Sequence, residues 1–182
     1  MLLILFAFSV GCLRPEVNAE DATLTDIVVT NTQDYLLVFF TVINCFTPEM
    51  KTAIDNGIDT AFTFIIKLYE VRGLWWDRKI ADVRVKHQIQ YDNLKKVYGV
   101  KLEERSDKVT YVEDFEEAKN LMSEIVGLRV SGLHKIQDGK RYQVRMRAEL
   151  DKIRLPLYLH YVFFFLSLWD FKTDWYTVDF RY

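Results

Sequence analysis

The sequence predicts a mainly β (α+β) fold, an antiparallel β-sandwich-like domain with two short capping helices. Hydrophobic and polar residues alternate with period two over most of the chain after residue 20, which is typical of strands that bury one face. Seven glycines and three prolines leave little loop material in 182 residues. Neither a repeat nor a linker divides the chain, so residues 20–182 are predicted to form a single β-rich domain.

The predicted strands differ in how their apolar residues are spaced. Residues 35–43 form an almost continuous apolar run, which predicts a strand that is buried on both faces. Residues 61–71 place alternate large side chains on one face. Residues 82–91 alternate up to the turn residues Asp92-Asn93, and the alternation resumes after them, which predicts a hairpin. Residues 141–150 and 176–182 supply two further alternating strands.

Two helices are predicted between these strands, at a sheet edge or an open end of the sandwich. Thr47 fits an N-cap with Pro48 at the first helical position, and Gly57 fits a C-terminal cap. Asp114 and Glu117 form a capping-box-like pair for the second helix. Its apolar stripe comprises Phe115, Ala118, Leu121, Met122, Ile125 and Val126.

Residues 1–19 are predicted to direct export. Residues 2–10 are a nine-residue apolar run, which is too short to span a bilayer as a helix and fits the core of a secretory signal. Cys12 fits lipid attachment in a bacterial lipoprotein signal, whereas cleavage after Ala19 fits an ordinary signal peptide. A third interpretation makes the run a buried first strand. Export would place the chain in the periplasm, or tethered to a membrane of a bacterial envelope through its N-terminal segment.

Composition and motifs argue against several functions. The formal net charge of −2 does not favour a nucleic-acid partner. The chain lacks a Gly-x-Ser-x-Gly elbow, His/Cys spacings of a zinc or iron site and a glycine-rich phosphate loop. Cys45, His87 and His160 lie in or beside apolar runs, where such residues are mostly core residues. We therefore predict no catalytic residues, no metal site and no cofactor.

The C-terminal region is unusually aromatic. Residues 155–169 contain one serine, one histidine and no charge, which leaves three interpretations: a buried strand or helix, an amphipathic element at a membrane surface, or a surface that docks a partner. The candidate partner- or ligand-binding residues are Tyr158, His160, Tyr161, Phe163, Phe165, Trp169 and Trp175.

A basic patch is predicted on the alternating strands. If these strands lie in one sheet, five cations share its exposed face and would meet anionic lipid head groups or an acidic partner. These residues are Arg84, Lys86, Arg141, Arg145 and Arg147. The alternative, which we favour, is a solvated face that Glu149, Asp82 and their neighbours neutralise.

Several stretches carry a family resemblance. They are residues 46–51 (FTPEMK), 62–64 (FTF), 91–96 (YDNLKK), 155–161 (LPLYLHY) and 174–177 (DWYT). Over residues 22–182 the chain resembles a bacterial family catalogued only as domain of unknown function 4390. The resemblance implies an exported or membrane-tethered protein without an assigned activity, and it supplies no site residues.

Together these observations predict a non-enzymatic protein of a bacterial cell envelope. It would bind another envelope component, a protein or a lipid, through its apolar-aromatic C-terminal region. The alternative is a carrier that holds a small apolar ligand or lipid in a cavity of the β-sandwich. An enzyme is the least favoured of the three functions.

Overall fold

The computed structural model describes residues 22–105, 108–151 and 172–182. The predicted export segment with Cys12 lies outside these described residues, and so does the apolar segment 155–169. The predictions made for both segments therefore stay predictions.

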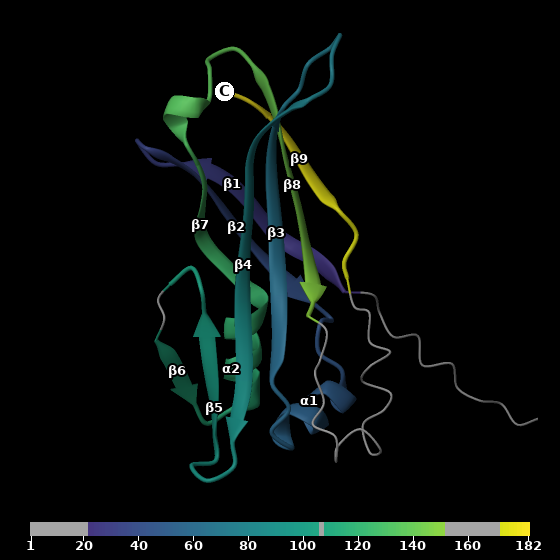
Figure 1. Cartoon of the computed structure of the whole chain (residues 1–182), viewed down its shortest axis with the longest axis vertical. Coiled ribbons are helices and arrows are strands. Elements are labelled where there is room, and N and C mark those ends of the chain that lie inside the picture. Colours follow the sequence, from purple (N-terminus) through teal and green to yellow (C-terminus); the bar gives the residue numbers. More distant parts are fainter. Residues whose placement is uncertain (1–21, 106–107, 152–171) are drawn as a thin grey trace, which may run out of the picture.

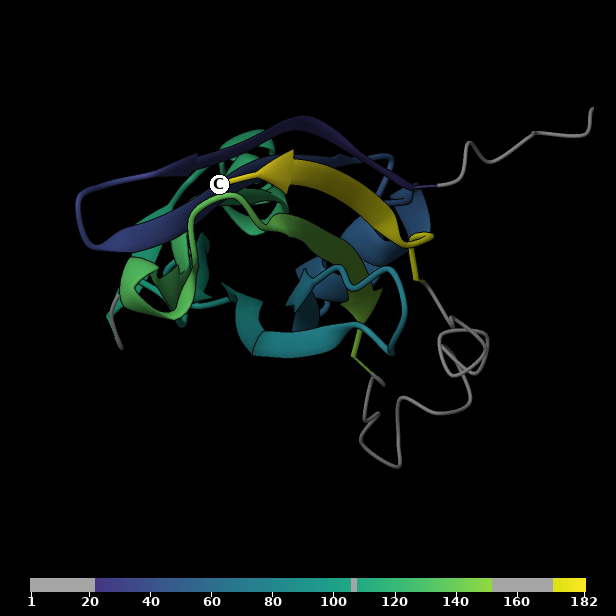
Figure 2. The ribbon, with the colours of Figure 1, turned by 90° about the horizontal axis from the view of Figure 1, so that it is seen from above.

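In the described residues the strands form two antiparallel sheets, one above the other (Figure 1, Figure 2). The smaller sheet has the order β1-β2-β7 and consists of β1 (Thr23–Asn31), β2 (Tyr35–Ile43) and β7 (Glu124–Gly132). The larger sheet has the order β6-β5-β4-β3-β8-β9 and consists of β3 (Thr60–Glu70), β4 (Arg78–Asp92), β5 (Val97–Leu102), β6 (Val109–Val112), β8 (Arg141–Leu150) and β9 (Tyr176–Arg181). The predicted α+β, sandwich-like fold class is confirmed.

The core lies between the two sheets, because alternate residues of each strand point to the same side. Phe40 of β2 and Phe64 of β3 meet across the layers with ring centroids 5.8 Å apart. Tyr142 of β8 is fully buried and stacks on Phe180 of β9. The alternation of apolar and polar residues in 61–71 and 141–150 thus correctly predicted which face of the larger sheet is buried.

The run at residues 35–43 is buried on one face only. Leu36, Val38 and Phe40 are buried, whereas Leu37 and Phe39 on the opposite face are half-buried. The prediction of burial on both faces is therefore wrong. In the described part of the chain the smaller sheet is an outer layer, so its second face has no layer packed over it.

The two predicted helices lie at one end of the sandwich (Figure 1). Helix α1 (Pro48–Asp55) begins as predicted, with the Thr47 hydroxyl accepting a hydrogen bond from the Met50 amide. The Tyr98 hydroxyl of β5 donates to Asp55 at 2.6 Å and fixes the end of this helix.

Helix α2 (Phe115–Ser123) begins at the predicted cap, where Asp114 accepts from the Glu117 amide. It ends at Ser123, so the predicted apolar stripe is wrong in its last turn. Ile125 and Val126 already belong to β7, in which Ile125 pairs with Phe40 of β2. Pairing with the sheet satisfies the backbone there, and the alternation sends Ile125 inward and Val126 outward. A short 3-10 helix, η1 (Leu133–Lys135), follows β7.

The predicted hairpin at residues 82–102 is formed by β4 and β5. Its turn is held by the Asp92 carboxylate, which accepts hydrogen bonds from the amides of Leu94 and Lys95 at 3.0 Å each. This turn lies at the end of the molecule that also holds α1 and α2 (Figure 1). The opposite end is formed by the connection between β3 and β4.

Candidate functional site

The predicted basic patch lies on the outer face of the larger sheet. Arg84 of β4 and Arg147 of β8 both pair with Ile65 of the intervening strand β3, so their side chains lie on the same face. Lys86 and Arg145 follow on the same strands. We call this surface, with Lys67 of β3, the charged sheet face. Arg141 stands apart at the beginning of β8, opposite Arg181 of β9.

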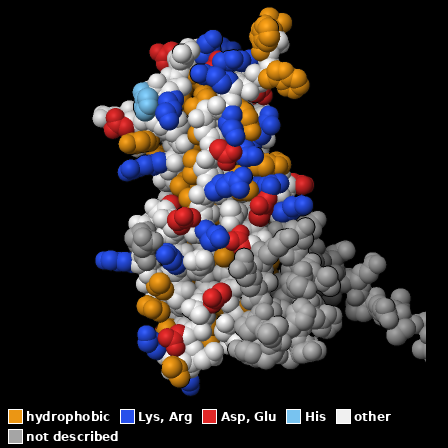
Figure 3. Space-filling model, in the orientation of Figure 1, with side chains coloured by type: hydrophobic (Ala, Val, Ile, Leu, Met, Phe, Trp, Pro, Cys, Tyr) orange, Lys and Arg blue, Asp and Glu red, His pale blue; other side chains and the backbone are white. Residues whose placement is uncertain are grey.

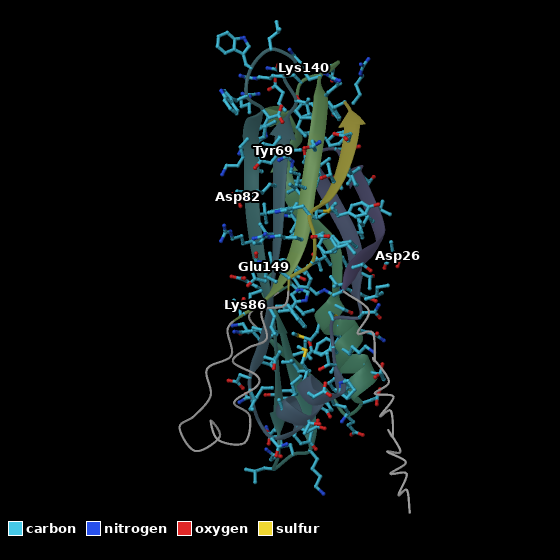
Figure 4. All side chains as sticks on the ribbon, turned by 90° about the vertical axis from the view of Figure 1, so that its right-hand side faces the viewer. Asp26, Tyr69, Asp82, Lys86, Lys140 and Glu149 are labelled. Atoms are coloured by element: carbon cyan, nitrogen blue, oxygen red, sulfur yellow. The ribbon has the colours of Figure 1, made fainter. Side chains whose placement is uncertain are left out.

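Carboxylates neutralise most of this face. The ion pairs are Arg84 with Asp82 (3.8 Å), Lys86 with Asp151 (2.6 Å), Arg145 with Asp77 (3.7 Å) and Arg147 with Glu149. Figure 3 shows basic and acidic side chains interleaved over the sheet, and Figure 4 shows Asp82, Lys86 and Glu149 along one side of it. This arrangement favours the neutralised, solvated interpretation over a strongly basic docking surface.

Trp175 is the one candidate of the aromatic C-terminal set that lies within the described residues. Its ring lies under two cations, with Arg147 Cζ 4.5 Å and Lys67 Nζ 5.0 Å from the ring centroid. A shallow groove of about 490 Å³ runs beside it and is lined also by Tyr69 and Arg145. Trp175 thus belongs to the charged sheet face. The other six candidates, Tyr158 to Trp169, lie outside the described residues.

Three of the four most exposed large apolar residues of the described chain lie together in the connection between β3 and β4; the fourth, Leu94, stands alone in the β4–β5 turn. We call residues 71–77 the hairpin tip. Leu74, Trp75 and Trp76 within it are 94%, 78% and 93% exposed. Figure 3 shows hydrophobic side chains standing out from the end of the molecule where this connection lies. Sequence reasoning missed them, although a Leu-Trp-Trp run directly after Gly73, between two alternating strands, was the available signal.

An ion-pair cluster anchors the base of the hairpin tip. Glu70 ends β3 and is buried, and it accepts a hydrogen bond from Arg78 Nε at 2.8 Å. Arg72 Nε lies 3.5 Å from its other oxygen. Burial acts to raise the pKa of the Glu70 carboxyl, but the two arginines outweigh it and hold the pKa below its usual range. The tip therefore projects from a fixed base.

Backbone amides at the start of the hairpin tip also form hydrogen bonds with β8 and with the end of the tip. The Val71 amide donates to the Arg141 carbonyl at 2.9 Å, and the Arg72 amide donates to the Asp77 carboxylate at 3.2 Å. A hollow of about 670 Å³ opens beside the tip, and its lining includes Trp75, Arg78 and Lys140. Exposed aromatic and basic side chains therefore lie together at this end of the molecule.

Basic residues surround the tip. They are Arg72, Arg78, Lys79, Lys140 and Arg141. Arg72 and Arg78 share Glu70, and Lys79 pairs with Asp82 at 3.0 Å. For Lys140 and Arg141 the described residues provide no ion pair. Figure 3 shows a group of Lys and Arg side chains at this end, and Figure 4 labels Lys140 there.

The buried side chains of His87 and Cys45 are hydrogen-bonded within the core. His87 is fully buried, with Nδ1 3.0 Å from the Met122 carbonyl oxygen and Nε2 3.0 Å from both carboxylate oxygens of Glu104. The buried Cys45 thiol donates to the Val42 carbonyl, and burial raises its pKa to about 11. A thiol with this pKa is protonated at neutral pH and is a poor nucleophile. The prediction that Cys45 and His87 are core residues is confirmed.

Two observations concern metals and membranes. Among the residues that the structure describes, no cluster of three or more His, Cys, Asp or Glu side chains could hold a metal ion. None of the described helices has the length and apolar character needed to cross a membrane.

Comparison with known proteins gives one result. A family model described as "Domain of unknown function (DUF4390)" matches residues 19–179. Neither the search of curated proteins nor that of solved structures returns a significant match.

Proposed function

The chain belongs to the DUF4390 family of domains of unknown function, and we propose that it is a non-enzymatic binding domain of a bacterial cell envelope. It binds another envelope component through the hairpin tip. The observation that carries this proposal is the nearly complete exposure of Leu74, Trp75 and Trp76.

Exposed side chains of this kind need an explanation. A folded domain of this size could bury two tryptophans and a leucine, and each buried side chain of this size stabilises a protein by about 1.5–3 kcal/mol. The chain instead places them on a short connection whose base is fixed by Glu70 and Arg78. Contiguous exposed apolar side chains bordered by polar residues are typical of surfaces that bind something.

A non-catalytic role is supported by the two buried reactive side chains, which make contacts within the core. His87 bonds a backbone carbonyl and Glu104, and Cys45 is a protonated core residue. The hollows beside the tip and on the charged sheet face are open to solvent, and charged side chains such as Arg78, Lys140 and Arg145 form part of their lining. These hollows give no support to the alternative of a carrier for a small apolar ligand.

The location in the envelope comes from the sequence of residues 1–19, with lipid attachment at Cys12 or cleavage after Ala19 as the two processing routes. The aromatic residues 158–169 stay a second proposed binding surface. Trp175 lies against Arg147 and Lys67 and is 39% exposed, so less of its ring is accessible than of the Trp75 and Trp76 rings.

A site-specific crosslinking experiment tests the proposal. The full chain is produced in a bacterial host with Trp76→p-benzoylphenylalanine, and the envelope is irradiated and analysed for adducts by mass spectrometry. Leu94→p-benzoylphenylalanine is the matched control, because Leu94 is an apolar side chain, 96% exposed, in the β4–β5 turn at the opposite end. We expect adducts with protein or lipid from position 76 and few from position 94. Equal yields at both positions, or none at position 76, would refute the proposal.

A further inference from the structure

We infer that the component bound by the hairpin tip is a lipid bilayer with anionic head groups, into whose interfacial layer Leu74, Trp75 and Trp76 insert. The inference rests on the proposed function, because it names the partner of the same site.

The apolar residues of the tip suit a bilayer interface. Tryptophan prefers the head-group region of membranes, where its apolar ring is buried and its indole N–H stays hydrogen-bonded. Trp75 and Trp76 are adjacent, and Leu74 adds an aliphatic side chain for the acyl boundary. Projecting side chains can insert into a fluid lipid layer, whereas a protein partner would need a pocket that fits them. A stable protein partner typically covers about 800 Å² of each chain, which is more than these three side chains offer by themselves.

The cations lie where lipid phosphates would be. Arg72 and Arg78 are two residues from Leu74 and Trp76 along the chain, where the tip joins strands β3 and β4. Both share the single charge of Glu70, so these three side chains carry one net positive charge. Asp77 in the tip accepts a hydrogen bond from the Arg72 amide and pairs with Arg145 of the charged sheet face. Lys140, beside Trp75 in the hollow, and Arg141 have no ion pair in the described residues. Each basic residue near an anionic membrane surface strengthens binding to it.

The orientation of the strands makes this contact geometrically simple. β3 and β4 run along the long axis of the molecule, and the tip is the end of their hairpin (Figure 1). The helices and the β4–β5 turn lie at the other end. A domain that inserts the tip therefore stands on the membrane and directs Leu94 away from it.

Vesicle flotation tests the inference. The full chain is mixed with vesicles of phosphatidylcholine alone, or of phosphatidylcholine with about one third phosphatidylglycerol, and the bound fraction is measured. The variants are Trp75→Ser/Trp76→Ser, Lys140→Gln and the control Leu94→Ser. All four side chains are exposed, so thermal unfolding should be unchanged. Since every variant keeps the N-terminal apolar run, differences between variants report on the tip.

We expect the double tryptophan variant to bind anionic vesicles about 100-fold more weakly than the unmodified chain. Lys140→Gln should weaken binding about fivefold on anionic vesicles and leave binding to neutral vesicles unchanged. Leu94→Ser should change binding to neither the anionic nor the neutral vesicles.

Equal binding by the unmodified chain and the double tryptophan variant would overturn the bilayer inference. In that case a protein adduct from position 76 in the crosslinking experiment would leave the proposed function standing, with a protein as the partner. The absence of any adduct at position 76 would reject the proposed function as well.

Discussion

Glu70 and Arg78 close the base of the β3–β4 hairpin: Arg78 Nε donates to Glu70 Oε2 at 2.8 Å, and Nη2 of the same arginine lies 2.6 Å from that oxygen. Glu70 is buried although the residues of the tip beyond it are among the most exposed of the described chain. The pair therefore marks the boundary between the packed sandwich and the projecting tip.

We predict that Glu70→Gln lowers the free energy of unfolding at pH 7 by about 1–3 kcal/mol, because a buried charge-assisted hydrogen bond is lost. The pKa of Glu70 is lowered in the folded state, so its stabilisation is present above its unfolded pKa of 4.5 and is lost as the pH falls. Urea unfolding at pH 7 and pH 3 measures both effects. A difference between variant and unmodified chain that is the same at both pH values would contradict this account.

His87 is predicted to be structurally important. Its two ring nitrogens lie 3.0 Å from the Met122 carbonyl oxygen and from the Glu104 carboxylate, both inside the core. His87→Leu removes a hydrogen-bonding partner from both of these groups, and we expect a loss of about 2–4 kcal/mol in the free energy of unfolding. The exposed residue His134 gives the matched control, His134→Leu. Chemical denaturation that finds both variants equally stable would show that the buried contacts contribute little.

The charged sheet face is predicted to have no part in membrane binding, because most of its cations are paired with carboxylates. Arg84→Gln/Lys86→Gln removes two cations, yet we expect flotation with anionic vesicles to change less than twofold. Lys140→Gln, which removes one unpaired cation beside the tip, should have the larger effect. A larger loss of binding for Arg84→Gln/Lys86→Gln than for Lys140→Gln would indicate that the charged sheet face binds the membrane.

The N-terminal predictions are tested by the mass of the mature protein. If Cys12 carries a lipid, the mature chain begins at Cys12 with an acylated cysteine, and Cys12→Ala abolishes that species. If cleavage follows Ala19, the mature chain begins at Glu20 and Cys12→Ala changes nothing. Mass spectrometry of the intact protein from the membrane fraction distinguishes the two routes. An N-terminus at Met1 would contradict both.

Much of the fold could be predicted from local patterns. The alternation at residues 141–150 identified the buried set from Tyr142 to Leu150, and the caps at Thr47 and Asp114 identified both helix starts. These features depend on residues close in sequence. The end of α2 could not be predicted in this way, because the pairing of Ile125 with Phe40 joins residues far apart in the chain.

The candidate site was predicted less well. The basic residues of β4 and β8 were correctly placed on one face, but their neutralisation by Asp77 and Asp151 depends on long-range contacts. The hairpin tip was missed because a Leu-Trp-Trp run is equally typical of a core. Only the strands on both sides of it, which pair from Thr60 to Glu70 with β4, show that the run is the exposed end of a hairpin.

The most direct test of the central claim is the depth of the tip tryptophans in a membrane. The full chain with Trp169→Phe/Trp175→Phe keeps Trp75 and Trp76 as its only tryptophans, and their fluorescence is measured with anionic vesicles whose acyl chains carry bromine at different depths. We predict a blue-shifted emission and the strongest quenching by the shallowest bromines, as expected for indoles at the interface. Emission at the wavelength of the free protein, without quenching at any depth, would contradict insertion of the tip.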